Sequence, residues 1–134
     1  QIPRKIKFWS IQRDKDNQFV VIFYNGGVKV YDLDGNEKPV TIASGAVTVT
    51  GANAVIDTEG SASTDDLVTI NGGSSGDILI CTANNGARTV VLKDGSGNLR
   101  LEGDFSLDTE NDKIVLIKNS GGNWCELSRS NNNA

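Results

Sequence analysis

The chain has 134 residues, a formal net charge of −4, and neither histidine nor methionine. This length fits one domain, or one domain with a small appendage. Without histidine, the chain cannot form serine–histidine or cysteine–histidine catalytic dyads or a histidine-containing zinc site, so we expect no enzyme of those classes.

The first predicted elements lie in residues 1–42. The stretch "KIKFWSIQ" alternates apolar and basic residues before Trp9 breaks the period, which is typical of a short strand or extended arm. Two β-rich runs follow, "FVVIFY" and "VKVYDL", separated by Asn25-Gly26-Gly27. Asn-Gly favours a tight hairpin turn because both residues tolerate positive φ. We therefore expect a small N-terminal β-meander or arm over residues 1–42.

The charge of the chain is unevenly distributed. Residues 1–38 carry seven Lys and Arg against five Asp and Glu, whereas residues 39–134 carry six against twelve. The basic excess lies in Arg4, Lys5, Lys7, Arg13 and Lys15. Such a segment can dock on an acidic surface, including that of a neighbouring copy, or remain a solvated arm. The acidic remainder disfavours nucleic acid as a partner.

Residues 43–134 alternate short apolar runs with turn sequences. No stretch holds a helical period, and turn signals recur about every eight to twelve residues, as in an all-β domain. We expect an antiparallel sandwich, jelly roll or barrel-like domain here. The expected strands include "AVTVT", Ala54–Asp57, "LVTI" (with a capped helical turn at Ser63 or Thr64 as the alternative) and "DILICTA"; Lys113–Lys118 and Asn123–Ser128 should form a terminal hairpin.

The stretch Gly86–Leu101, "GARTVVLKDGSGNLRL", has the glycine content of a phosphate-binding loop but lacks the Lys-Ser/Thr and the following helix that such a loop needs. It predicts a hairpin with Asp94–Gly97 as its turn. No run of roughly 20 apolar residues indicates a membrane span, so we expect no membrane partner.

Two acidic clusters are the candidates for metal binding or for a glycosidase carboxylate pair. They comprise Asp57, Glu59, Asp65 and Asp66, and Asp104, Asp108, Glu110 and Asp112. Neither has the spacing of a calcium loop, so solvated loops are the simpler interpretation and we expect no cofactor. Cys81 and Cys125 lack zinc-site spacing and fit two small apolar residues on strands, with a disulfide as the alternative.

The remaining candidates are interface residues. Phe8 and Trp9 are adjacent, so one of them should face away from its own core and can anchor a partner. Trp124, next to Cys125, should face the opposite side of a strand and serve as a core or subunit-interface anchor. Arg88 and Arg100 are either solvated or paired with acidic residues of a neighbouring subunit.

Residues Ala46 to Ser130 resemble a module found at the C-terminal end of tailed-phage virion proteins. The matching motifs are Asp57–Gly60, Asp65–Gly73, Gly76–Asp77, Ala87–Asn98 and Gly121–Ser130. The resemblance implies a trimeric, all-β structural protein of the virion. It also implies assembly in the reducing host bacterial cytoplasm, where free thiols are favoured. Residues 1–42 show no comparable resemblance.

These features predict a capsid decoration (cement) protein, a homotrimer bound to the major capsid protein or another virion protein through residues 1–42. The short chain favours this over a long fibre. The alternative is a short tail fibre, spike or baseplate component that binds host glycans. A glycan-cleaving enzyme is the third hypothesis.

Overall fold

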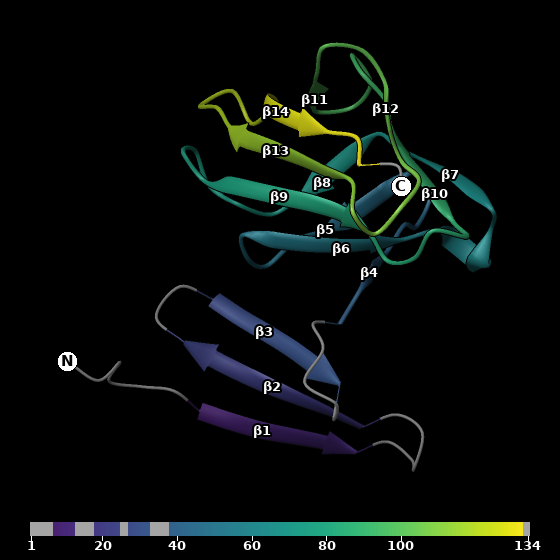
Figure 1. The fold of residues 1–134 in the computed structure, drawn as a ribbon. Coiled ribbons are helices and arrows are strands. Elements are labelled where there is room, and N and C mark those ends of the chain that lie inside the picture. The colour runs from purple at the N-terminus through teal and green to yellow at the C-terminus, as the bar shows by residue number, and fades with distance from the viewer. Residues whose placement is uncertain (1–6, 13–17, 25–26, 33–37, 133–134) are drawn as a thin grey trace. The chain divides into compact units, whose positions relative to one another are not determined.

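The computed structural model describes residues 7–12, 18–24, 27–32 and 38–132, the first three ranges by their backbone alone. The chain divides into two compact units, Gln1–Lys38 and Pro39–Ala134, drawn in Figure 1. They are called the N-terminal unit and the C-terminal unit below.

The N-terminal unit contains a three-stranded antiparallel sheet. Its strands are β1 (Lys7–Gln12), β2 (Gln18–Tyr24) and β3 (Gly27–Asp32), in the order β1-β2-β3. The pairing of β2 with β3 runs up to Tyr24 opposite Gly27, and the predicted Asn25-Gly26 turn lies outside the described residues. The predicted β-meander is confirmed.

The C-terminal unit consists of eleven short strands and one 3-10 turn within residues 38–132. They are β4 (Val40–Thr41), β5 (Ala46–Thr48), β6 (Asn53–Asp57), η1 (Glu59–Ser61), β7 (Thr64–Leu67), β8 (Thr69–Asn71), β9 (Ile78–Ala83), β10 (Thr89–Leu92), β11 (Leu99–Arg100), β12 (Phe105–Leu107), β13 (Lys113–Lys118) and β14 (Trp124–Ser130). No described helix is long and apolar enough to cross a membrane.

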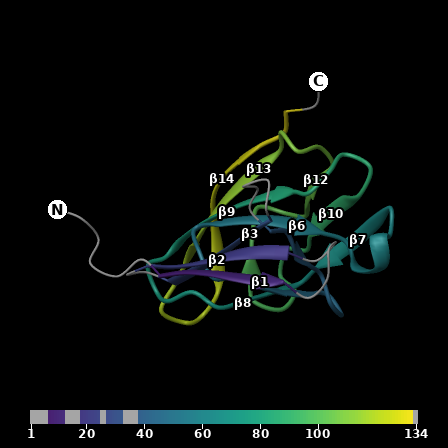
Figure 2. The same ribbon diagram turned by 90° about the horizontal axis from the view of Figure 1, so that it is seen from below.

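The first strands of the C-terminal unit coil like a short solenoid. Strands pair in parallel with strands further along the chain, in the series β4-β6-β9, β5-β8 and β7-β10. Ala46 lies opposite Thr69, Thr64 opposite Thr89 and Ala54 opposite Cys81, so these turns of the coil take about 25 residues, whereas the first, from Val40 to Ile56, is shorter. Figures 1 and 2 show β7, β10 and β12 grouped apart from β9, β13 and β14.

The last strands close the coil in the antiparallel sense. β12 pairs with β10, and β13 pairs with both β9 and β14. The result is a six-stranded sheet in the order β11-β14-β13-β9-β6-β4, a three-stranded sheet β12-β10-β7 and the two-stranded pair β5-β8. The predicted terminal hairpin is confirmed as β13–β14.

The predicted all-β class is confirmed, but the predicted antiparallel arrangement is wrong for the C-terminal unit. Its described strands form five parallel pairs and three antiparallel ones, in a solenoid-like arrangement. Short apolar runs between glycine turns are shared by hairpins and by solenoid turns. Their spacing therefore predicted strands without predicting which strands become neighbours.

The predicted hairpin within Gly86–Leu101 is also wrong. β10 pairs with β7 and β12, whereas β11 pairs in parallel with β14. The turn glycines are present, with φ of 69° at Gly95 and 50° at Gly97. However, the chain leaves this turn toward a different sheet. A Cβ on Gly97 would lie 2.0 Å from the Val68 carbonyl oxygen, so only glycine permits this close passage.

A single apolar core lies between the three sheets of the C-terminal unit. Leu67, Leu79, Leu92 and Ile114 are fully buried, each from a different strand. Ile42 is buried in this core too, although the sequence predicted residues 1–42 as the N-terminal segment. It anchors the start of the C-terminal unit, which begins at Pro39.

Candidate assembly surface

The six-stranded sheet carries apolar side chains on its outer face as well as in the core. Along β9, Leu79 and Cys81 are fully buried, whereas Ile78 and Ile80 are 41% and 37% exposed. This alternation places the two isoleucines on the side opposite the core. Burial within the C-terminal unit therefore does not account for them.

β13 extends this apolar surface next to β9. Val115 and Ile117 are half-buried and alternate with the fully buried Ile114 and Leu116. Ile117 lies opposite Ile78, and Val115 lies opposite Ile80. Directly opposed side chains on one sheet face contact each other, so these four residues form one continuous patch.

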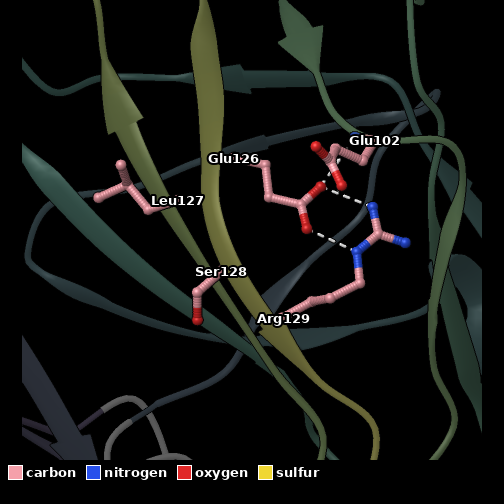
Figure 3. Close-up of a pocket in the computed structure, with 5 residues that line it drawn as sticks. All are labelled: Glu102, Glu126, Leu127, Ser128 and Arg129. Atoms are coloured by element: carbon pink, nitrogen blue, oxygen red, sulfur yellow. Dashed lines mark hydrogen bonds and ion pairs between the residues drawn. The ribbon is translucent and has the colours of Figure 1, made fainter.

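β14 adds Leu127 through an irregularity in the pairing. Val115 lies opposite Ser128 and Leu116 opposite Glu126, which leaves Leu127 as the extra residue of a β-bulge. Leu127 is 55% exposed. Figure 3 shows its side chain pointing away from Glu126 and Arg129. The assembly face is defined here as Ile78, Ile80, Val115, Ile117 and Leu127.

The size of the assembly face indicates how it can be used. Three strands about 4.8 Å apart and six residues long give a footprint of about 300 Å². A specific interface covers about 800 Å² per partner. The assembly face therefore fits one part of a larger contact rather than a complete interface.

A part-buried ion pair within β14, between Glu126 and Arg129, lies beside this face and is hydrogen-bonded to the β11–β12 connection (Figure 3). The Glu126 side chain is only 8% exposed, and the Arg129 guanidinium donates to both carboxylate oxygens from Nε at 2.5 Å and Nη2 at 2.6 Å. The Glu102 backbone N–H donates to the same carboxylate at 2.9 Å. The Arg129 hydrogen bonds hold the pKa of Glu126 below its ordinary value.

Arg129 also contacts residues that follow Glu102 in the β11–β12 connection and in β12. Its Nη2 donates to the Gly103 carbonyl at 3.0 Å, and its guanidinium lies 4.8 Å from the centre of the Phe105 ring. A shallow pocket of about 420 Å³ lies here, lined by Glu102, Glu126, Leu127, Ser128 and Arg129. Because the Glu126–Arg129 pair is bidentate, we expect it to hold β14 rigidly where this pocket borders the assembly face at Leu127.

The two arginines predicted as interface candidates have contacts within their own unit. The Arg88 Nε lies 3.0 Å from Asp57 Oδ1, so Arg88 is paired inside the subunit. Arg100 is exposed, and its Nη1 donates to the backbone carbonyls of Leu99 at 2.6 Å and Gly97 at 3.3 Å. The sequence could not distinguish these backbone contacts from a subunit contact.

Trp124, the predicted aromatic anchor, lies in the core. It is 1% exposed, and its indole Nε1 donates to the Ile70 carbonyl at 3.1 Å. It therefore presents no surface to a partner, whereas its neighbour Cys125 is half-buried on the other side of β14, as predicted. The structure describes β1, which contains Lys7, Phe8 and Trp9, by its backbone alone, so it does not test these side chains as interface residues. The other two basic candidates, Arg4 and Lys5, lie outside the described residues.

The carboxylates of the first acidic cluster serve local structure. Asp65 accepts the Glu59 backbone N–H at 2.7 Å, and Glu59 accepts the Ser44 N–H at 3.0 Å. Asp57 accepts the Asn84 amide at 3.1 Å in addition to its ion pair. Within the described part of the chain, no three acidic or cysteine side chains gather as a metal site.

The second acidic cluster contains an interacting carboxyl pair. Asp112 is fully buried and accepts the backbone N–H groups of Asp108, Thr109 and Asn132. The side-chain interaction of the Asp108 carboxyl with the Asp112 carboxyl, followed by burial, raises the pKa of Asp108. These contacts tie the β12–β13 turn to the C-terminal tail at Asn132.

The assembly face was not found from the sequence. The sequence feature that could have indicated it is the pair of runs "ILIC" and "IVLI", which are apolar at every position and not only at every second one. Continuous runs of this kind indicate strands covered on both faces. Only the register of β9 against β13 shows which residues form the outer surface.

A search of the curated proteins finds no match to this chain. The family model of the bacteriophage nozzle protein matches residues 1–98, which include the whole N-terminal unit. The expectation that residues 1–42 carry no family resemblance is therefore wrong, and assignment to a head decoration or tail fibre type gains no support. The chain belongs to the bacteriophage nozzle protein family and is a structural protein of the phage virion.

Proposed function

We propose that this protein is a non-enzymatic structural component of the phage tail, at the nozzle, and not a cement protein of the head shell. The family match over residues 1–98 carries this proposal. The assembly face supports it, because a subunit that joins others needs apolar surface left over after its own core has formed.

The energetics favour assembly through several weak contacts. At about 25 cal/mol per Å², covering the whole footprint of about 300 Å² as if it were all apolar contributes about 7.5 kcal/mol. Association costs an estimated 4–15 kcal/mol in lost freedom of motion, so this face alone gives little net affinity. We therefore expect assembly only where further contacts of the same subunit are made at the same time.

Capsid decoration remains the competing function, and copy number separates the two. A decoration protein is present in many copies over the head, whereas a tail component is present in few. Gel densitometry of purified virions, with the major capsid protein as standard, should give a low ratio for this chain. A ratio approaching that of a shell-covering protein would contradict the tail assignment.

The role of the assembly face can be tested by charge insertion. Ile80→Asp places a carboxylate in the middle of the face, and Ser120→Asp places one on the exposed β13–β14 turn as the control. We expect Ile80→Asp to fold but to be excluded from virions in a complementation assay, with Ser120→Asp incorporated normally. Equal incorporation of the two variants would show that the assembly face is not needed for incorporation into virions.

The predicted homotrimer belongs to this proposal too. Light scattering of the purified full chain gives its subunit number, which tests three copies directly. Binding of the isolated protein to host cells would favour the glycan-binding tail fibre instead. Hydrolysis of host polysaccharide, abolished by one carboxylate substitution, would favour an enzyme.

A further inference from the structure

The outer edge of β8 in the two-stranded β5–β8 sheet is completed by side chains. The Ile70 N–H donates to Asn98 Oδ1 at 2.9 Å, and Asn98 Nδ2 donates back to the Ile70 carbonyl at 2.8 Å. The Asn98 amide thus takes the place of a neighbouring strand. The Trp124 indole donates to the same carbonyl.

Among residues 38–132, the outer edge of β5 is completed only at its first residue: the Ala46 N–H donates to the Ala43 carbonyl at 3.1 Å and the Ala43 N–H donates back at 2.9 Å, which leaves Thr48 as the open position of this strand. The Val49 N–H donates to the Asn71 carbonyl at 2.9 Å, so alternation directs the Thr48 N–H away from β8. β5 is the terminal strand of its sheet. β4 is likewise terminal, and because the Ile42 N–H donates to Asp57, the Thr41 N–H faces outward. Open edges of this kind are templates for an added strand.

A hollow of about 420 Å³ lies between these two edges. It is lined by Val40, Thr41, Ala43, Ala46, Val47, Thr48 and Asn71. Its lining is therefore mainly small and apolar, with polar residues on the two open strands. An extended segment that pairs with β5 could place apolar side chains in this hollow.

The rim of this open end is acidic. Glu59 contacts the turn between β4 and β5 through its hydrogen bond from Ser44, and Asp65 bonds to Glu59 in turn. The C-terminal unit as a whole carries twelve acidic residues against six basic ones.

We propose that residues 4–8 of a second copy of this chain, "RKIKF", add to β5 as an extra strand. Alternation along a strand puts Ile6 and Phe8 on one side and Lys5 and Lys7 on the other. The apolar pair fills the hollow, and the basic pair meets the acidic rim. β1 is a terminal strand of its own sheet, so pairing its first residues with β5 leaves its contacts with β2 intact.

The charges favour this segment as the occupant. Arg4, Lys5 and Lys7 give it three positive charges and no negative one, opposite in sign to the unit that receives it. The presence of at least two copies side by side in the particle rests on the proposed function. The strand pairing itself can be tested on the free protein.

The experiment uses disulfide trapping between two differently tagged full-length chains. One carries Ile6→Cys and the other Thr48→Cys, both with Cys125→Ser, and Cys81 stays fully buried. The control partner carries Arg100→Cys, which is exposed elsewhere on the same unit. We expect the mixed-chain disulfide to form with Thr48→Cys roughly tenfold more than with Arg100→Cys, the ratio that about 1.4 kcal/mol of preference gives.

Charge reversal provides the second measurement. Adding Lys5→Glu and Lys7→Glu to the Ile6→Cys chain should reduce trapping to the Arg100→Cys level. In a Trp9→Phe background, the emission of Trp124 in the C-terminal unit should stay unchanged. Equal trapping by both partners would overturn the proposal. A third chain carries both Ile6→Cys and Thr48→Cys. If the disulfide formed only within this chain and not between two chains, the added strand would not come from a second copy. Neither result affects the tail assignment, which copy number and position in the virion decide separately.

Discussion

The Glu126–Arg129 pair allows a sharp prediction, because removing one partner leaves the other buried. In Arg129→Met, the Glu126 carboxylate, whose side chain is 8% exposed in the wild type, keeps only the Glu102 N–H as a hydrogen-bond donor. Breaking a fully buried pair in this way costs about 3–5 kcal/mol. Since Arg129 itself is 28% exposed, we expect a smaller loss of unfolding free energy, about 2–3 kcal/mol.

The assay is urea unfolding followed by tryptophan fluorescence in a Trp9→Phe background, where Trp124 is the remaining tryptophan and reports on the C-terminal unit. The matched control is the double variant Arg129→Met/Glu126→Met, which removes both charges. It should be more stable than Arg129→Met alone, because no uncompensated carboxylate remains buried.

The pH dependence has a defined sign. The folded state lowers the pKa of Glu126, so the pair stabilises the fold fully above the ordinary value of 4.5 and less as the pH falls through the lowered value. The difference between wild type and Arg129→Met should therefore shrink in acid. A loss below about 0.5 kcal/mol at neutral pH, the size of an exposed pair, would refute the reasoning.

Three further predictions concern single positions. Gly97→Ala should destabilise the C-terminal unit far more than Gly95→Ala, because a Cβ at Gly97 meets the Val68 carbonyl at 2.0 Å and one at Gly95 meets nothing within 4 Å; similar urea midpoints would contradict this. Asp108→Asn should stabilise the protein at neutral pH and lose its effect below the ordinary pKa of 3.8, because the raised pKa of Asp108 makes its ionised form unfavourable in the fold. Destabilisation at neutral pH would show that the charge of Asp108 is needed. Cys125 should react with a maleimide in the native protein, whereas Cys81, whose pKa burial raises to about 12, should react only after unfolding. Equal labelling rates by mass spectrometry would argue against the burial of Cys81.

The parts of the fold that depend on local contacts were predictable. The N-terminal meander and the β13–β14 hairpin join strands that are neighbours along the chain, and the β13–β14 turn carries the glycine and asparagine that favour a tight turn. The coil was not predictable in the same way. Its parallel pairs join residues such as Ala54 and Cys81, with no repeated motif to reveal the interval.

For the candidate site, too, features that depend on local contacts were predictable and those that depend on long-range contacts were not. The alternation that placed Trp124 and Cys125 on opposite faces is a local property, and it was correct. The exposure of Ile78 and Ile80 depends on whether another layer covers the sheet, which the run "ILIC" does not encode. The Asn98 amide on Ile70 is another long-range contact, since the residues are 28 positions apart.

The position of the protein in the assembled particle tests the central claim most directly. Electron cryomicroscopy of virions, with a small tag at the C-terminus to mark this chain, gives that position. The account predicts tagged density at the tail and none over the head shell. Tagged density distributed over the capsid surface would contradict it.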